Sequence, residues 1–518
     1  MQIDIKDEYD VIILGSGLTG LMVGNVLQKN GFSTLIVDKM PKAGGKCCEL
    51  NWHGVKFDNF GKWDTVYGTS NPKESSFYRA CMEADLELKL NPVPWRVGFL
   101  KKGGTKPEYL SIDNWEGGRA MLDFAKKMTG IELTESQKEE FTQTLKKMQS
   151  YSFKELMKMT NLSLKEWIDQ NVKDELVKQF FNLGCIVTDT PPEEAGFPHS
   201  AWTTGNLVQG KFSYVTVAGG SLFKTLITPL VESAQEKGAD ILTNYTVQEI
   251  VIKDNAVDSV WIMDNSTFLN YKIKAKNIIV NIPLFDAYPK LLKDEMLDSD
   301  ELEYIKRLKE TNTNDLSCYY ILKKGTIKDL PGHFHCFDVT SGIPIYIGEM
   351  AQQKVFGAIV PDEYDYLQVY IPGGHAGGYL MYKGDPYDVS YETLEKVKNQ
   401  VLGIITQWMV PGFKENIVYS AITWSPNFGR YCQMAFPTNV ESKSKKINGL
   451  YFAGDTVDVT CIGKLGIERC GEVALRCTRA FLEDNKETQK VTISRISGVK
   501  PVTKPQKRKG ISKKAEVT

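Results

Sequence analysis

The first residues able to do chemistry are glycines and a carboxylate near the start of the chain. Gly15, Gly17 and Gly20 stand in the order G-x-G-x-x-G. Gly15 permits a tight turn, Gly17 lets a pyrophosphate approach the backbone, and Gly20 allows a helix to pack closely on a strand. Asp38, 18 residues after Gly20, is placed to accept hydrogen bonds from two ribose hydroxyls. These residue types at this spacing predict a dinucleotide site.

A strand, a helix and a second strand must hold these residues in place, and the sequence predicts all three. An apolar, β-branched run predicts a strand over Tyr9–Leu14, directly before the glycines. A helix is expected over Leu21–Gln28, with Gly31 after its end, and a second strand over Thr34–Val37. The helix N-terminus offers N–H groups and a partial positive charge to phosphates. This context favours cofactor binding over a glycine-rich turn of purely structural origin.

Two further segments could complete such a site. Gly44, Gly45 and Lys46 follow Asp38, and the glycine pair lets the backbone pass close to the far end of a cofactor. Near the other end of the chain, residues 449–455 predict a strand that ends in Gly-Asp, and a helical pattern follows from Gly466. The carboxylate would meet a ribityl hydroxyl, and the helix N-terminus would meet the pyrimidine edge of an isoalloxazine ring. This second motif selects FAD over NAD.

The composition limits the classes of function. The 518 residues are enough for two or three domains, and 63 basic against 64 acidic residues argue against bulk binding of nucleic acid. The 10 cysteines form no C-x-x-C pair, which predicts reduced thiols in a cytosolic protein. Acidic residues precede the first apolar run, so no signal peptide is expected. No apolar run approaches the roughly 20 residues of a membrane-spanning helix.

Three blocks of the sequence resemble the phytoene dehydrogenase-like branch of the FAD-dependent amine oxidoreductase superfamily. They are Tyr9–Gly61, Gly219–Ile250 and Gly449–Leu475, in the order typical of that family. The resemblance implies an α/β fold, in which a Rossmann-type (GR2-like) FAD-binding domain is interleaved with an α+β substrate domain. It also implies that Val247 contacts adenine through its backbone. Where family members usually carry Arg, this chain has Lys46, which keeps the charge but loses the guanidinium fork.

We therefore expect a discontinuous FAD-binding domain made of residues 1–70, 205–290 and 425–485. A helical cap (71–204) and a mixed β-sheet (291–424) would form the substrate domain. The residues expected to contact the cofactor are Gly15, Gly17, Leu18, Thr19, Gly20, Asp38, Lys39, Gly45, Lys46, Val247, Gly454, Asp455, Gly466 and Ile467.

Local sequence patterns predict individual helices and strands within the helical cap and the mixed β-sheet. Helices are expected from about Glu74 to Val187, and three of them would begin at capping boxes. These boxes pair Thr134 with Gln137, Ser152 with Glu155, and Ser163 with Glu166. Strands are expected at 318–322, 343–347, 355–360 and 366–371. The block after Gly219 predicts a helix over Leu222–Lys237 and a strand over Thr246–Ile252.

The resemblance implies hydride transfer between FAD and a small lipophilic substrate, of polyene or isoprenoid kind. Desaturation, saturation and redox-assisted isomerisation of C–C bonds all fit. Oxidation of an amine, or a non-enzymatic prenyl-lipid carrier of the GDP-dissociation-inhibitor kind, are the alternatives. A carrier has no need to keep both Asp38 and the Gly454-Asp455 pair. The patterns leave the oligomeric state open.

The sequence does not assign a definite role to several polar residues. No side chain is assigned as catalytic acid or base. Lys464 and Glu468 lie near the expected flavin edge, where they could tune the flavin or simply start a helix. His333 and His335 share a face of a possible strand, but no carboxylate or thiolate stands at matching spacing, so no metal site is expected. The basic tail at 497–518 predicts disorder, either solvated or attracted to anionic lipid, which leaves peripheral membrane contact open.

Overall fold

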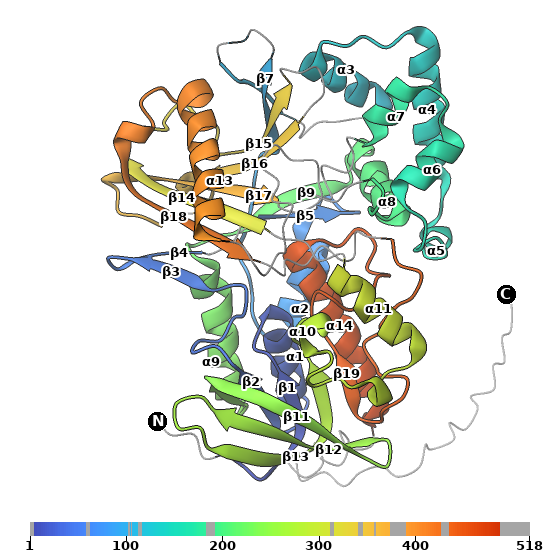
Figure 1. Cartoon of the computed structure of the whole chain (residues 1–518), viewed down its shortest axis with the longest axis vertical. Coiled ribbons are helices and arrows are strands. Elements are labelled where there is room, and N and C mark those ends of the chain that lie inside the picture. Colours follow the sequence, from blue (N-terminus) through green and yellow to red (C-terminus); the bar gives the residue numbers. More distant parts are fainter. Residues whose placement is uncertain are drawn as a thin grey trace, which may run out of the picture.

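The computed structural model of the protein is shown in Figure 1. It describes residues 5–58, 63–101, 104, 106–111, 117–182, 192–310, 315–339, 345–356, 359–372, 390–425 and 435–486. The predicted basic tail lies outside the described residues. Within this part of the chain, no helix is both long and apolar enough to cross a bilayer.

The first sheet carries the strands predicted to hold the cofactor. Its order is β10-β2-β1-β13-β12-β11, and β19 pairs with β13. Pairing is parallel from β10 to β13 and on to β19, whereas β12 and β11 are antiparallel. Parallel strands are covered on both faces, which explains the continuous apolar runs of β1 and β2. The bounds are β1 Glu8–Leu14, β2 Thr34–Asp38, β10 Asp240–Thr243, β11 Tyr245–Lys253, β12 Ala256–Asp264, β13 Asn270–Val280 and β19 Leu450–Phe452.

Helices from distant parts of the sequence cover this sheet. Helix α1 (Leu18–Lys29) packs on α14 (Gly466–Asp484) and on α9 (Thr228–Glu236), and α2 (Ser76–Glu83) packs on α14. Figure 1 shows a segment from the early part of the sequence, α1, beside one from the late part, α14. The buried Asn25 of α1 donates a hydrogen bond to the carbonyl of Leu230 in α9 and so joins two of these helices. The predicted α/β architecture is confirmed.

The helices and the strand predicted next to the glycine motifs are present, but the helices begin or end at residues other than those predicted. Helix α1 begins at Leu18, three residues earlier than predicted, and Gly31 follows its end with φ +86°, as expected of a helix C-terminal glycine. The helix predicted over Leu222–Lys237 is a π turn, Phe223–Ile227, that leads into α9. The strand predicted over Thr246–Ile252 lies within β11.

The second sheet is mostly antiparallel, in the order β18-β14-β17-β16-β15-β7-β8. Helix α13 (Tyr391–Ile404) lies against it, and its Val397 and Val401 belong to the same apolar cluster as Leu367 of the sheet. The bounds are β7 Arg96–Lys101, β8 Glu108–Ser111, β14 Asp315–Lys323, β15 His333–Val339, β16 Ile345–Gln352, β17 Tyr364–Pro372 and β18 Ile417–Ser425.

The strand predictions for this sheet are partly right. The strands predicted at 318–322 and 366–371 lie within β14 and β17. The prediction at 343–347 overlaps β16 from Ile345, and residues 343–344 lie outside the described part. The strand predicted at 355–360 is wrong, because Gln353–Phe356 form a short helix, α12, and residues 359–360 belong to no strand; residues 357–358 lie outside the described part. A short apolar run does not distinguish helix from strand by itself.

Helices α3 to α8 form a cluster with its own apolar core, and they occupy the upper right of Figure 1. All three predicted capping boxes are present, at Thr134, Ser152 and Ser163. The bounds are α3 Gly117–Thr129, α4 Glu135–Ser150, α5 Phe153–Leu156, α6 Leu164–Asn171, α7 Glu175–Asn182 and α8 Phe197–Val208.

The helical prediction for Glu74 to Val187 is wrong at residues 90–111, where three strands form instead. Strands β7 and β8 join the second sheet, and β6 (Leu90–Pro92) joins a small sheet of order β5-β9-β6. Strand β7 pairs on one side with the neighbouring β8 and on the other with β15, more than two hundred residues later. A pairing at that separation leaves no local periodic signal. The other strands are β5 Trp63–Tyr67, β9 Phe212–Val217, β3 Glu49–Trp52 and β4 Val55–Asp58.

The remaining short elements are α10 Leu284–Ala287, α11 Ser299–Glu310, η1 Pro72–Glu74, η4 Asp294–Met296, η5 Ile405–Met409 and η6 Lys414–Asn416. Helices α10 and α11 follow β13 directly and pack on each other. Tyr304 of α11 donates a hydrogen bond to the carbonyl of Thr456, so this pair supports the segment after β19.

Candidate cofactor site

The first glycine motif forms the turn from β1 into α1. Gly15 has φ +105° and its N–H donates to the carbonyl of Val37 in β2. Gly17 is the N-cap of α1, so Leu18 and Thr19 lie in the first turn of the helix. Among the described residues, no side chain caps this N-terminus and its first turn carries no acidic residue, whereas Ser75 caps α2. The N–H groups at the start of α1 therefore remain for an anion.

The two later glycines of the motif serve different purposes. A Cβ at Gly20 would lie 2.4 Å from both Asn281 Nδ2 and the Gly15 carbonyl oxygen, so protein packing alone requires glycine there. A Cβ at Gly17 would meet its nearest atom of the described chain, Asn281 Nδ2, at 3.6 Å, which is an ordinary contact. Gly17 has φ −61° and ψ 167°, a conformation open to any residue. Neither the backbone nor the packing of the described residues requires glycine at Gly17.

Asn281 is the residue that the sequence analysis missed. It follows β13, its N–H donates to Leu14, and its Nδ2 donates to the Gly15 carbonyl at 2.9 Å. A Cβ at Gly454 would stand 3.3 Å from its Oδ1. That oxygen is buried and accepts no hydrogen bond from the described residues. Asn281 thus holds both glycine motifs in register and leaves a buried acceptor between them.

Asp38 ties the glycine turn to the end of β2. Its Oδ2 accepts hydrogen bonds from the N–H and the hydroxyl of Ser16, and its Oδ1 accepts from the N–H of Met40 at 2.8 Å. A carboxylate has about four acceptor positions, so one remains for a ribose hydroxyl. Asp38 is 8% exposed, which leaves part of the carboxylate accessible.

Lys39 and Val247 lie at the same end of the first sheet as Asp38. Thr243 of β10 pairs with Asp38, and Val247 follows in the next strand, β11. The Lys39 carbonyl accepts a hydrogen bond from Asn265, in the turn that links β12 to β13, and its side chain is exposed. Both residues are thus positioned for the ribose and adenine end of a dinucleotide, and their contacts remain predictions.

The second glycine pair packs directly on the first motif. The N–H of Gly44 donates to the Ser16 carbonyl at 3.0 Å, and a bridge pairs Gly44 with Gly17. Gly45 has φ +56°, and a Cβ there would lie 3.1 Å from the Gly17 Cα. Lys46 follows, and its Nζ lies 2.7 Å from Asp455 Oδ2. This ion pair joins two motifs that are 409 residues apart in the sequence.

The C-terminal motif is held by a buried arginine. Gly454 has φ +98° and follows β19, and Arg469 of α14 donates to the carbonyls of Asp455 and Val457. Arg469 is completely buried and also donates to the Asp458 carbonyl. Since a guanidinium has five donors in one plane, a single side chain fixes the course of this loop. The sequence analysis gave Arg469 no role.

The start of α14 lies beside a small pocket. Gly466 and Ile467 form the first residues of the helix, and no side chain of the described residues caps its N-terminus. The pocket is lined mainly by apolar side chains. The lining residues are Val66, Ser75, Phe77, Leu90, Val215, Thr216, Val217, Ile467 and Glu468.

Glu468 supports the N-terminus of α2, and its role toward a flavin stays a prediction. Its carboxylate accepts hydrogen bonds from the N–H groups of Ser76 and Phe77 at 2.9 Å each, at the N-terminus of α2. Lys464 forms an ion pair with the same carboxylate. Glu468 is fully buried. Helix-terminus binding accounts for this pair of residues.

The cap helix α8 contacts the loop between Asp455 and α14. The N–H of Gly463 donates to His199 Nδ1 at 3.1 Å, and a Cβ at Gly463 would lie 2.2 Å from Trp202 Cδ1. Burial, reinforced by the positive charge of Arg469, lowers the pKa of His199 to about 3, so this imidazole is neutral. Cys461 lies in the same loop, and burial raises its pKa to about 12. A thiol with that pKa is a poor nucleophile for covalent attachment of a cofactor.

The residues around both glycine motifs fit a flavin dinucleotide. An uncapped helix N-terminus, a glycine that protein packing does not require and a buried free acceptor at Asn281 all converge on one place. Each of them is suited to a polar, anionic group that approaches the backbone closely.

Comparison with known families agrees with this geometry. The family model described as flavin containing amine oxidoreductase matches residues 18–462. The chain belongs to this family. The predicted relationship and the predicted oxidoreductase class are therefore confirmed. The description of the family states that its members contain a flavin.

Individual relatives narrow the comparison. Prolycopene isomerase 1 from an Oncidium hybrid cultivar is 23% identical over 59% of this chain and 53% of its own length. The chain thus spans about half the length of that relative. A lycopene-forming phytoene desaturase from Pseudescherichia vulneris is 22% identical over 80% of this chain and 85% of its own. An oxidoreductase from Methanosarcina mazei shares the fold, with TM-score 0.62, 15% identity, and coverage of 91% and 99%.

Proposed function

We propose that this chain holds FAD noncovalently and transfers a hydride between the flavin and a lipophilic substrate of polyene or isoprenoid kind. Convergence of the Gly15–Gly20 turn, the Gly45-Lys46 pair and the Gly454-Asp455 pair carries the proposal. Three segments far apart in the sequence build one cradle that can accept both halves of a dinucleotide. A bound flavin supplies the hydride acceptor or donor.

Each motif has a separate task in this proposal. The N–H groups at the start of α1 bind the pyrophosphate, and Asp38 binds the ribose of the adenosine half. Asp455 binds a ribityl hydroxyl, and the N-terminus of α14 stabilises negative charge on the reduced ring. Gly466 and Ile467 form that N-terminus. The buried Cys461 thiol supports noncovalent binding.

The substrate class in this proposal rests on the names of the curated relatives. Curated relatives are named as a prolycopene isomerase and a phytoene desaturase, which act on polyenes by name.

The test begins with the purified full chain. We expect a yellow protein with flavin absorbance bands, and we expect acid treatment to release FAD, identified by its mass. The flavin is then mixed anaerobically with polyenes, quinols and amines in turn. Bleaching by a polyene supports the proposal, whereas bleaching by amines alone overturns the substrate class. A colourless protein that cannot be reconstituted with FAD would point to the carrier alternative.

A further inference from the structure

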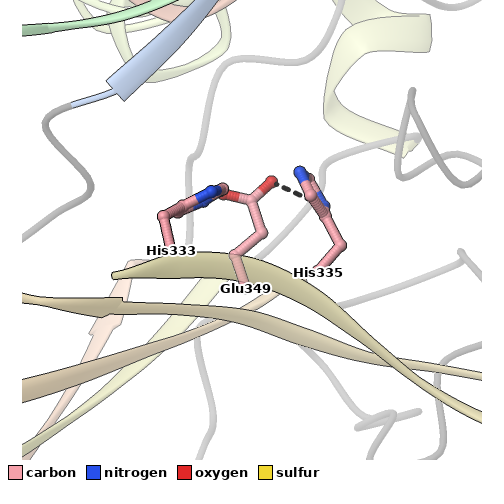
Figure 2. A group of neighbouring side chains, drawn as sticks. All are labelled: His333, His335 and Glu349. Carbon is pink, nitrogen blue, oxygen red and sulfur yellow. Dashed lines mark ion pairs between the residues drawn. The ribbon is translucent and has the colours of Figure 1, made fainter. Parts of the chain in front are cut away.

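Two histidines and a glutamate of the second sheet point toward one another (Figure 2). His333 and His335 lie on β15, and Glu349 lies on β16, directly opposite His335 in the antiparallel ladder. Side chains at i and i+2 of a strand share a face, so all three project from the same side of the sheet. The sequence analysis found no carboxylate at matching spacing. The neighbouring strand supplies it.

The distances define a compact group of donor atoms. His335 Nδ1 lies 3.4 Å from Glu349 Oε1, and His333 Nε2 lies 3.8 Å from Glu349 Oε2. One ligand atom from each residue lies within 4.8 Å of the others. The hydroxyl of Tyr214, on β9, lies 3.0 Å from His333 Nε2 and 3.4 Å from Glu349 Oε2.

These separations fit the edges of a metal coordination shell. Donors bound at about 2.1 Å in a tetrahedron stand about 3.4 Å apart. A nitrogen–oxygen hydrogen bond would instead be roughly 2.7–3.2 Å long, shorter than either imidazole–carboxylate separation. Two imidazoles with one carboxylate are a ligand set for zinc and for iron(II).

The surroundings hold the ligands in place and leave two of them partly exposed. The His333 side chain is fully buried, whereas those of His335 and Glu349 are 14% exposed. The ring of Trp95 stacks on Tyr214 at 5.7 Å and packs on His335 at 5.6 Å. Restricted rotamers reduce the entropy that an ion must overcome to order its ligands.

We propose that His333, His335 and Glu349 bind one divalent transition-metal ion of the zinc or iron(II) class, beside the Tyr214 hydroxyl, which is hydrogen-bonded to His333 Nε2 in the ion-free protein. Tyr214 belongs to the small sheet and the other three residues to the second sheet. The ion would therefore lie where the two sheets meet. This role is separate from the flavin chemistry, and its test does not depend on that chemistry.

The experiment measures metal binding by the full-length protein as purified. The protein is treated with a chelator, dialysed, and titrated with Zn²⁺. Bound metal is counted by elemental analysis, and the thermal midpoint is followed. We expect one ion per chain and a midpoint that rises with Zn²⁺ concentration. Replacement of Zn²⁺ by Co²⁺ should add visible ligand-field bands outside the flavin spectrum.

Variants distinguish a built site from adventitious binding. Glu349→Gln keeps the shape but removes the charge, and it should weaken Zn²⁺ binding at least tenfold. His53→Ala removes an exposed imidazole in the β3–β4 turn and should change nothing. Wild-type protein that binds no stoichiometric Zn²⁺ overturns the proposal without any variant. Equal binding by Glu349→Gln and wild type also overturns it, and the group is then a hydrogen-bonded network.

Discussion

One prediction concerns Gly17. Neither its backbone conformation nor the packing around it requires glycine, so we attribute the glycine to a bound ligand that approaches the backbone. Serine is preferred over glycine at a helix N-cap by a few tenths of a kcal/mol. The space around Gly17 admits a Cβ at ordinary contact distance. We therefore expect Gly17→Ser to leave the free energy of unfolding of the apoprotein unchanged or slightly higher. The same hydroxyl would bind the N–H groups of Thr19 or Gly20, which the pyrophosphate needs.

The expected loss of affinity follows from those N–H groups. Hydrogen bonds to a charged group contribute about 1.5–3 kcal/mol each, so losing one or two costs roughly 3 kcal/mol. That corresponds to an increase of about 100-fold in the Kd for FAD. Apoprotein is titrated with FAD by quenching of flavin fluorescence, and unfolding is measured in denaturant without FAD. Unchanged FAD affinity in Gly17→Ser would refute the assignment of this turn to the pyrophosphate. A large loss of apoprotein stability would refute the packing argument.

Three further predictions test the supporting residues. Gly20→Ala should lower the free energy of unfolding by roughly 2–4 kcal/mol, from overpacking and the lost Asn281–Gly15 hydrogen bond. Gly403→Ala, an exposed helical site with open space around it, is the matched control and should be neutral or stabilising in denaturant unfolding. Lys46→Met should weaken FAD binding while Lys46→Arg retains it. Stability should change by less than about 1 kcal/mol, because the ion pair is partly exposed. Equal Kd values for both variants would contradict this. The pKa of His199 is about 3 in the folded protein and about 6.5 for an ordinary histidine, so between these pH values the unfolded chain binds one proton more than the folded chain. Stability should fall as the pH drops below 6.5, by about 2 kcal/mol at pH 5. His199→Asn, which keeps an acceptor for Gly463, should remove that part of the pH dependence, and an unaltered profile would show that His199 does not titrate as described.

The sequence by itself determined the first glycine turn and the class of fold. The structure of the segment from Tyr9 to Asp38 could be predicted from local sequence, because its strand, turn and helix signals lie within one continuous segment. The capping boxes of α4, α5 and α6 were predictable for the same reason, since each hydrogen bond spans three residues. The helix after the C-terminal motif followed from its periodicity.

Only the tertiary structure decided how separate segments combine. Asn281 looks like any polar residue after a strand, and its role depends on β13 lying between β1 and β19. Strands β6 and β7 were mistaken for helix although β7 also pairs locally with β8, because their other partners, β9 and β15, lie more than a hundred residues later in the sequence. Glu349 meets two histidines only because β15 and β16 pair in one register. Contacts of this kind arise from packing and strand register, for which local patterns of residue type carry no signal.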